Sequence, residues 1–495
     1  MNPKSWTIKN PLDTRKASFP DKKSLSFNGP KASGKRQSSP PNLGPWSPLL
    51  KGIFLFTLLF SLGFFFPMTT LCQEGKEPQM VTLDKALQIA LEKNKDIQKA
   101  REYRRQVEGR YVEERAAALP QFLIQAGLSR DRDESQKAIF RTIPVERETR
   151  SAGIGFSQIL YSFGQVEAAI RAAKIGIKTA DDQLVLYQQA ALKEVSSAFY
   201  DVLLAKELYA LACQNLEQRN RHSDEARKKY QAGTATDYDI LAAEVAVENA
   251  RPEVIRTENL IRLSREKLRF LLGLENQGID AQGSLLTSIS PYPSYEDSLS
   301  VAWKNRPELS NFKHRIGMAE ELLTIAKAGN LPRLNLKAGY GWQSLDYQPG
   351  QADGPIWTAG LFVTFPFFDG LRTQGKVVQA KSELATLKIE EAKLIDAIVL
   401  QTREAVNTVR EAGEIVNGLS GTVSQAQRLR DMAEKGFQFG VKTRLEVDDA
   451  QLNLVLAQSN LAKARRDYLT AKTTLNWVMG TIQAPPTSPL SALQK

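Results

Sequence analysis

Cysteine and histidine are almost absent from this 495-residue sequence, which contains two of each. Cys72 and Cys213 are too few and too far apart for a disulfide framework or a cysteine-rich zinc or iron–sulfur site. His222 and His314 lie in helical stretches with charged neighbours, so we expect both to be solvated surface residues. The sequence shows no cluster of nucleophile, base and orienting acid. It therefore predicts no enzyme, no metal site and no cofactor.

Long apolar runs are also scarce. The longest is Ile53–Phe66, 14 residues without a charge, and no other uninterrupted run reaches 18 residues. As a helix this run would span ~21 Å, short of the ~30 Å hydrocarbon core of a bilayer. Lys51 precedes the run and Pro67 closes it, which is typical of an export signal. We expect a signal peptide over residues 52–72, with an uncleaved membrane anchor as the alternative.

Acidic residues are scarce only at the start of the chain. The formal net charge is +11, but residues 1–72 hold ten Lys or Arg and two Asp or Glu, whereas the rest hold 56 and 53. The basic excess is therefore local and does not predict a nucleic-acid partner. Residues 1–51 show no hydrophobic period and are expected to be a disordered basic lead. Whether Cys72 carries a lipid is left open, because Leu71 stands where a small residue is expected.

The rest of the chain contains an internal repeat. Lys228–Thr236 (KKYQAGTAT) and Lys435–Thr443 (KGFQFGVKT) share Lys, Gln, Gly and Thr at an offset of 207. Each half is predicted to run from a short helix through a Leu-Pro pair, two strands, a very long helix and a glycine turn into a final helix. The predicted parts are a first repeat over 81–275, a linker over 276–293, a second repeat over 294–480 and a disordered tail over 481–495.

Two segments predict helices of unusual length. Gln165–Ala232 has 68 residues and Leu371–Phe439 has 69, both without proline, and each would extend ~100 Å. Their apolar positions are sparse and fall at helical spacing, as at Leu384, Leu387 and Leu394. Helices with such a narrow apolar stripe need to pack against neighbouring helices to be stable, as in a coiled coil. Taken alone, these segments are equally consistent with a soluble coiled coil.

Between Pro332 and Pro366 the hydrophobic period changes from 3.6 to 2. Four runs of about 7–10 residues alternate in this way, close to the 9–11 of a tilted membrane strand. Hydrophilic loops are predicted within each pair, over 131–149 and 344–354. Aromatic residues near the strand ends predict a membrane girdle of Tyr340, Trp342 and Trp357. The residues on the apolar face are Phe122, Ile124, Ala126 and Leu128, then Ala152, Ile154 and Phe156, then Leu334, Leu336, Ala338, Tyr340 and Trp342, then Trp357, Ala359, Leu361, Val363 and Phe365.

Four strands cannot close a barrel in lipid, because each unpaired edge group would cost several kcal/mol. Spanning barrels begin at eight strands. If the strands lie in a membrane, the chain must therefore share a barrel with copies of itself. Two copies would give eight strands and three would give twelve, and strand physics does not choose between them. Two soluble hairpins packed on the helices are the alternative.

With the doubled organisation, Phe365–Arg372 (FPFFDGLR) and Phe437–Thr443 (FQFGVKT) make the sequence resemble the TolC family of outer-membrane efflux and secretion ducts. The resemblance implies a homotrimer with a transmembrane β-barrel of twelve strands in the cell outer membrane and an α-helical barrel forming a tunnel through the periplasm. It implies passive export as part of a tripartite efflux pump or type I secretion system. The implied partners are a periplasmic adaptor (membrane fusion protein), an inner-membrane pump and outer-membrane lipid. A periplasmic coiled-coil adaptor without its own pore is the alternative function.

The resemblance also implies roles for residues near the two glycine turns. Glu446 and Asp449 match the family's aperture acids, and three copies would form two stacked carboxylate rings that favour cations. Lys442 and Asp239 match a basic and an acidic residue that tie the tips shut. Phe437 stands where the family has an aromatic hydroxyl, which puts one closing hydrogen bond in doubt. The expected adaptor-contacting tip residues are Gly233, Thr234, Ala235, Thr236, Gly440, Val441, Lys442 and Thr443.

Overall fold

The structure is a computed structural model that describes residues 79–133, 145–275, 278–286, 289, 291–347 and 350–483. The expected lead over 1–51, the expected signal peptide over 52–72 and nearly all of the expected tail lie outside the described residues. Among the described helices, none has the length together with the hydrophobicity that a membrane-spanning helix needs.

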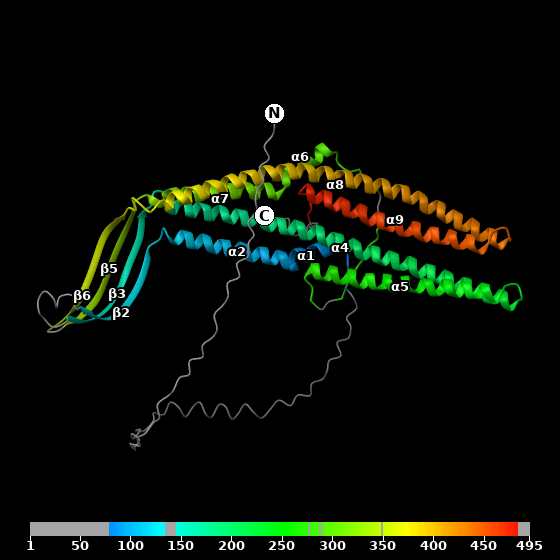
Figure 1. The fold of residues 1–495 in the computed structure, drawn as a ribbon, viewed down its shortest axis with the longest axis horizontal. Helices are drawn as coiled ribbons and strands as arrows, with labels where there is room; N and C mark the ends of the chain where they lie inside the picture. Colours follow the sequence, from blue (N-terminus) through cyan, green and yellow to red (C-terminus); the bar gives the residue numbers. More distant parts are fainter. Residues whose placement is uncertain are drawn as a thin grey trace, which may run out of the picture. The chain divides into compact units, whose positions relative to one another are not determined.

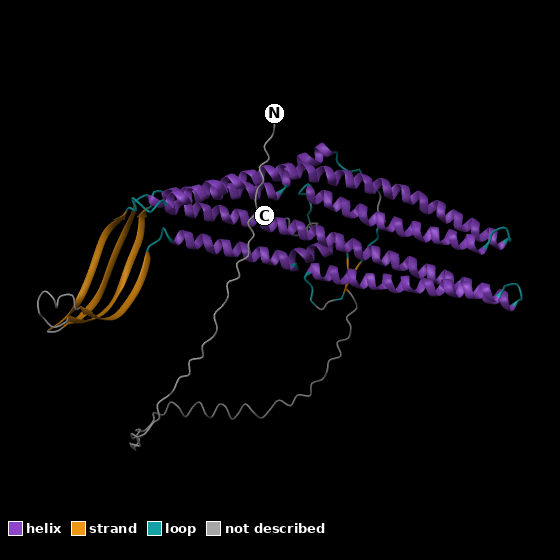
Figure 2. Ribbon diagram, viewed as in Figure 1, coloured by secondary structure: helices purple, strands orange, loops and turns teal. Residues whose placement is uncertain are grey.

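The same order of elements occurs in both halves of the described chain (Figures 1 and 2). In the first half the elements are β1 (Gln79–Val81), α1 (Leu83–Lys93), α2 (Lys95–Ala116), β2 (Gln121–Asp133), β3 (Val145–Tyr161), α4 (Gln165–Gln231) and α5 (Asp237–Leu272). In the second half they are β4 (Ile279–Ala281), α6 (Tyr295–Asn305), α7 (Pro307–Lys327), a 3-10 turn (Ala328–Asn330), β5 (Arg333–Tyr347), β6 (Gly350–Thr364), α8 (Arg372–Gln438) and α9 (Arg444–Val478).

The two long helices agree with the sequence prediction to within one residue at each end. Each folds back on the helix that follows it, so that α4 with α5 forms a first hairpin and α8 with α9 a second. The two hairpin turns, residues 232–236 and 439–443, lie at the opposite end of the helices from the sheet (Figure 1). We call these two turns the tips.

The four long strands form one antiparallel sheet in the order β2-β3-β5-β6. The two halves therefore meet through the pairing of β3 with β5. In the described chain, β2 and β6 each pair on one side only, which leaves the sheet open at both edges.

The strands are longer than the sequence indicated, at 13, 17, 15 and 15 residues. Many of the extra residues fall within the expected loops, where residues 131–133, 145–149, 344–347 and 350–354 are strand. The prediction of loops throughout 131–149 and 344–354 was therefore wrong. Along the extension of β2 and β3, charged side chains form ion pairs. Arg130 lies 2.8 Å from Glu146 on the neighbouring strand, and Arg150 lies 2.6 Å from Glu148. Alternation of apolar and polar residues stops before the backbone pairing does.

The main core lies midway along the helices. The short strands β1 and β4 pair in parallel there, and their residues Val81, Ile279 and Ala281 are buried against α1, α4 and α5. A second apolar cluster joins α8 to α9 and includes Val409, Tyr468 and Leu475. The tips are connected to these cores by the hairpin helices.

A glycine in the left-handed conformation ends each half. Gly273 (φ +66°) follows α5 and packs against the carbonyl group of Lys93, where α1 ends. Gly480 (φ +70°) follows α9 and packs against the carbonyl group of Asn305, where α6 ends. Both sites combine a backbone conformation that favours glycine with a space that excludes a side chain.

Replacing Gly273 with alanine should lower the unfolding free energy by roughly 2–5 kcal/mol. The left-handed backbone accounts for about 1–2 kcal/mol of this loss, and overlap of the new Cβ with the Lys93 carbonyl for about 1–3 kcal/mol. Thermal loss of helical circular dichroism measures the change. Gly233→Ala is the control, since Gly233 has φ +75° but open space for 4 Å around the point where a Cβ would lie. Equal losses in the two variants would contradict the packing argument.

Candidate functional site

Both tips are built by the same local chemistry. Gly233 (φ +75°) and Gly440 (φ +74°) reverse the chain, and a threonine then caps the next helix. The Thr236 amide donates to Asp239 Oδ2 at 2.8 Å, and the Thr443 amide donates to Glu446 Oε2 at 2.8 Å. These reciprocal capping boxes satisfy backbone groups that a helix start would leave unpaired. The rest of the expected tip residues lie in or beside these turns.

Three of the four expected aperture residues take part in this capping chemistry. Lys442 Nζ lies 2.5 Å from Glu446 Oε1, and this hydrogen bond, together with the Thr443 amide, lowers the pKa of Glu446 to about 2. Asp239 accepts a hydrogen bond from the backbone amide of Thr236, and this bond lowers the pKa of the Asp239 carboxyl group. Within the chain, Lys442 therefore bonds to Glu446 and not to Asp239. Glu446 is ionised and pre-positioned by its own turn.

Asp449 differs from the other three. Its side chain is exposed, and it makes no hydrogen bond or ion pair with another described residue. It lies one helical turn after Glu446 on α9, so the two carboxylates project from the same side of the helix. Among the four expected aperture residues, Asp449 is the one whose charge is not used within the described chain.

Sequence reasoning missed a charged cluster between the two hairpins, just inside the tips. Arg219 of α4 lies 2.5 Å from Asp448 of α9, and Arg444 of α9 lies 3.0 Å from His222 of α4. A cavity of about 450 Å³ opens beside these residues. The expectation of a solvated His222 was wrong, because its side chain is only 14% exposed. No signal along the sequence joins residues more than 220 positions apart.

His314 also differs from its expectation. Its Nδ1 lies 2.6 Å from Asp182 Oδ2 of α4, and the ring is half-buried between α7 and α4. The expectation that this histidine is a solvated surface residue was therefore wrong as well. Within the described residues, no group of three His, Cys, Asp or Glu is arranged to hold a metal ion.

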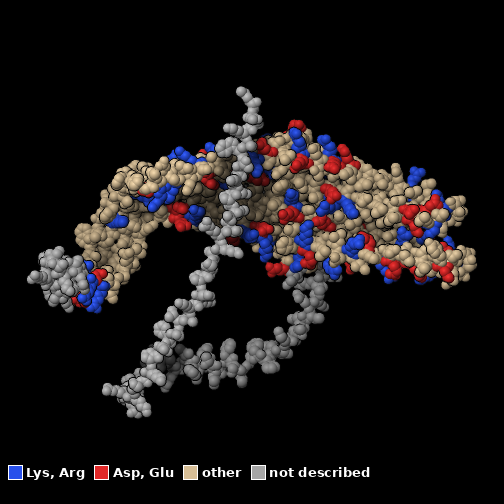
Figure 3. Space-filling model, in the orientation of Figure 1, with Lys and Arg blue, Asp and Glu red and all other residues tan. Residues whose placement is uncertain are grey.

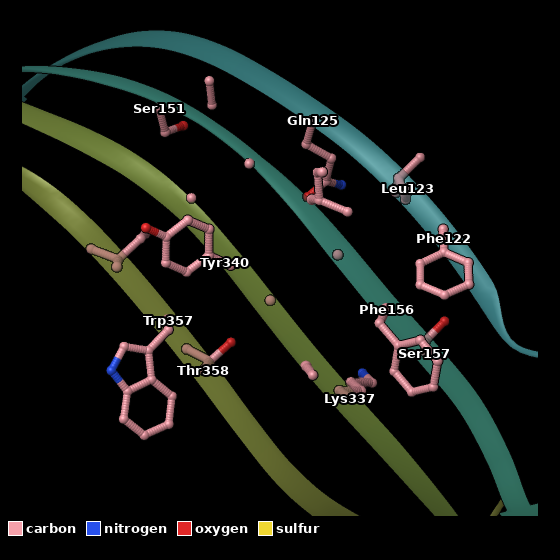
Figure 4. A pocket seen from close by; sticks show the side chains of 18 of the residues that line it. Phe122, Leu123, Gln125, Ser151, Phe156, Ser157, Lys337, Tyr340, Trp357 and Thr358 are labelled. Carbon is pink, nitrogen blue, oxygen red and sulfur yellow. The ribbon is translucent and has the colours of Figure 1, made fainter.

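The sheet carries the expected girdle residues on one face. Tyr340 and Trp357 are register partners and lie side by side on neighbouring strands (Figure 4), and they are 68% and 75% exposed. Trp342 lies on the same face, two residues further along β5. Phe122 contacts Phe156 with ring centroids 5.3 Å apart (Figure 4). The register places the apolar positions of all four strands on one common face.

A second group of exposed aromatic residues lies where the strands bend into the long helices. Phe365, Phe367 and Phe368 follow β6. Tyr161, the last residue of β3, contacts Phe163 at a centroid distance of 4.8 Å. The sequence did not predict this group as part of the girdle. At the other end of the apolar face, the charged pairs of β2 and β3 begin. Figure 3 shows uncharged surface over much of the sheet and charged side chains at its far end.

The duplicated chain has two long helical hairpins and an open four-stranded sheet with one exposed apolar face bounded by aromatic residues, which is the architecture of an outer-membrane channel. The family model for outer membrane efflux proteins matches residues 86–274 and 298–481. The chain belongs to this family, as the resemblance to TolC-type ducts predicted, and it is therefore an outer-membrane protein.

Individual relatives agree with this assignment. The chain is 24% identical to outer membrane protein TolC of Vibrio cholerae over 74% of this chain and 83% of that protein. It is 24% identical to the alkaline protease secretion protein AprF of Pseudomonas aeruginosa, over 61% of this chain and 64% of that protein. The crystal structure of the CmeC outer membrane channel of Campylobacter jejuni superposes with a TM-score of 0.72 at 16% identity, over 83% of this chain and 88% of that one. These likenesses show the fold.

Proposed function

We propose that three copies of this chain form a passive duct that exports substrates across the periplasm and the outer membrane. The observation that carries the proposal is the open sheet. Its apolar face is exposed along all four strands, and its two edges lack partners in the described chain. The apolar face could contact lipid, but the unpaired backbone groups of the two edges would be unsatisfied there. Three copies would close the edges into a twelve-stranded barrel, within the range known for such barrels.

The helices support the same assembly. Exposed apolar residues recur on α8 at Val378, Ile389 and Leu400, a spacing of 11 residues that keeps them on one side of the helix. A comparable set lies on α5, at Leu241, Val245, Ile255, Leu263 and Phe270. Unpartnered stripes on such long helices fit contacts with neighbouring copies, which would complete an α-helical tunnel. The repeats over 81–275 and 294–480 would then give six similar units around the tunnel.

The tips fit a protein partner. Tyr238, Phe439, Val441 and Leu445 are exposed apolar residues gathered at the ends of the hairpins. We propose that this surface contacts a periplasmic adaptor, which would connect the duct to an inner-membrane pump. The names of the relatives include both an outer membrane channel and a protease secretion protein. The chain itself therefore supports an export duct and leaves the cargo to its partners. Family membership disfavours the adaptor function for this chain.

Replacing Asp449 with asparagine should weaken block of the channel current by divalent cations by roughly tenfold or more. Three symmetry-related carboxylates would line the aperture, and each contributes on the order of 1 kcal/mol of attraction even at the dielectric constant of water. Single-channel recording in planar bilayers, with added magnesium or calcium, measures the block. We choose Asp449 alone because Glu446 also caps α9.

Glu411→Gln is the matched control, since Glu411 is exposed on α8 far from the tip. It should leave the block unchanged. Unaltered block in Asp449→Asn would remove Asp449 from the aperture, and absence of any current from the wild-type protein would contradict the duct itself.

A further inference from the structure

The contact between the two hairpins near the tips is polar, whereas the interior of the second hairpin is apolar there. Within the second hairpin, Ala433, Val447 and Ala450 form a buried cluster with Phe437. Between the hairpins, Gln218 donates to Glu434 at 3.2 Å, and Arg219 pairs with Asp448. Two cavities of about 450 and 390 Å³ lie along this contact. Separating the hairpins would therefore expose little apolar surface, whereas unfolding the second hairpin would expose much more.

His222 is a neutral acceptor at the centre of this contact. Its Nδ1 lies 3.0 Å from Arg444 Nη1, and a guanidinium group has protons to donate but no lone pair to accept with. The Nδ1 atom must therefore carry the lone pair, and the ring proton must lie on Nε2. A proton added at Nδ1 would remove the hydrogen bond and place an imidazolium directly against the Arg444 guanidinium.

The charges around His222 are unevenly placed. Glu225 Oε2 lies 3.7 Å from Nδ1 and favours the protonated ring, as does Asp448 at longer range. Asp448, however, already bonds to both arginines. The titratable and charged groups around this contact are Arg219, Glu225 and Lys229 on α4, Tyr238 and Asp239 on α5, and Arg444 and Asp448 on α9.

The balance favours the neutral ring while the hairpins are together. Burial lowers the pKa of His222, Arg444 lowers it further, and Glu225 and Asp448 raise it by less. A lowered pKa means that the closed contact is fully stable above the ordinary histidine value of 6.5 and loses stability as the pH falls below it. In the separated state the ring is solvated and regains its ordinary affinity for a proton.

We propose that His222 is a pH-sensitive latch, in which protonation breaks its bond to Arg444 and releases the second hairpin from the first. The latch concerns the contact within one chain, and only its effect on conduction rests on the proposed duct. Helix α8 contains a site at which it could bend when the second hairpin separates from the first. Gly418 and Gly421 lie in its interior with open space around them, where α4 has Leu211 and Gln214 at the same offset of 207. Glycine weakens a helix interior relative to such residues.

The test measures the distance between the hairpins in the detergent-solubilised full chain. Spin labels at Asp224 of α4 and Leu452 of α9, with the native cysteines replaced by alanine, report the separation by electron resonance. Both positions are exposed. We expect the mean distance to increase between about pH 7.5 and about pH 5.5, the range over which an ordinary histidine titrates. In bilayers, channel open probability should rise several-fold over the same range.

Three variants separate the latch from other effects of pH. His222→Gln retains an acceptor for Arg444 but cannot titrate, so its distance should stay short at both pH values. His222→Lys carries a permanent charge and should be separated already at about pH 7.5. His314→Gln, the matched control in the middle of the helices, should behave as wild type.

Two results would overturn the latch. The first is a wild-type distance that does not change with pH, which can be read even if the variants fail to fold. The second is an unchanged pH response in His222→Gln. A distance change in wild type without any current at either pH would retain the latch and reject the duct.

Discussion

Arginine at position 124 should abolish assembly of the protein in the outer membrane. Ile124 is 79% exposed in the middle of the apolar face, and its register partner is Ile154. An arginine near the middle of a bilayer costs roughly 2–4 kcal/mol in a β-barrel. Three copies in one barrel would multiply this cost to roughly 6–12 kcal/mol per trimer. Outer-membrane fractionation, followed by electrophoresis of unheated samples, measures the loss of the proposed heat-resistant trimer.

The neighbouring residue gives a matched control. Gln125 lies next along β2 and projects from the opposite face, which would line the watery interior of the proposed barrel. Gln125→Arg should therefore assemble normally, because its charge would be solvated. A normal trimer from Ile124→Arg, or loss of the trimer in both variants, would contradict the assignment of the two faces.

The main elements were predictable because their signals are periodic and local. The long helix Gln165–Gln231 follows from a proline-free run of good helix formers, and Gly164 and Gly233 mark its two ends. The faces of the strands follow from alternation with period two. The strand ends were not predictable in this way. Beyond Leu128 the strand pairing continues through charged residues. Such residues predict a loop when the neighbouring strand is unknown.

In the candidate site, too, the local contacts were predictable from the sequence and the long-range contacts were not. The local structure of a tip can be predicted from the sequence, since Thr443 and Glu446 stand three positions apart in the pattern of a capping box. The bond between Lys442 and Glu446 joins positions four apart, within reach on any helix start. The contact of His222 with Arg444 depends on how two hairpins pack, and no periodicity in a single sequence records that. The sequence therefore predicted a surface residue where His222 is largely covered.

Removing the carboxylate of Asp280 should destabilise the middle of the protein by about 3–5 kcal/mol. The Asp280 side chain is 8% exposed and lies 2.8 Å from both Arg265 of α5 and Lys206 of α4. Asp280→Ala would leave the partly buried cations of Arg265 and Lys206 without this carboxylate, and removing one partner of such a group is strongly destabilising. Lys206 also donates to the Ala281 carbonyl at 2.7 Å, so β4 would lose part of its attachment to α4.

Thermal unfolding of the detergent-solubilised chain, followed by circular dichroism, measures this loss. Glu102→Ala is the control, because Glu102 lies 2.6 Å from Arg105 in an ion pair that is largely exposed. Exposed pairs contribute about 0–1 kcal/mol, so the control should melt close to wild type. A double variant, Asp280→Leu with Arg265→Met, should recover part of the loss, because it removes the unpaired charge of Arg265 as well as its partner. Equal melting of Asp280→Ala and Glu102→Ala would show that burial adds nothing to this pairing, and that β4 is held by its apolar neighbours alone.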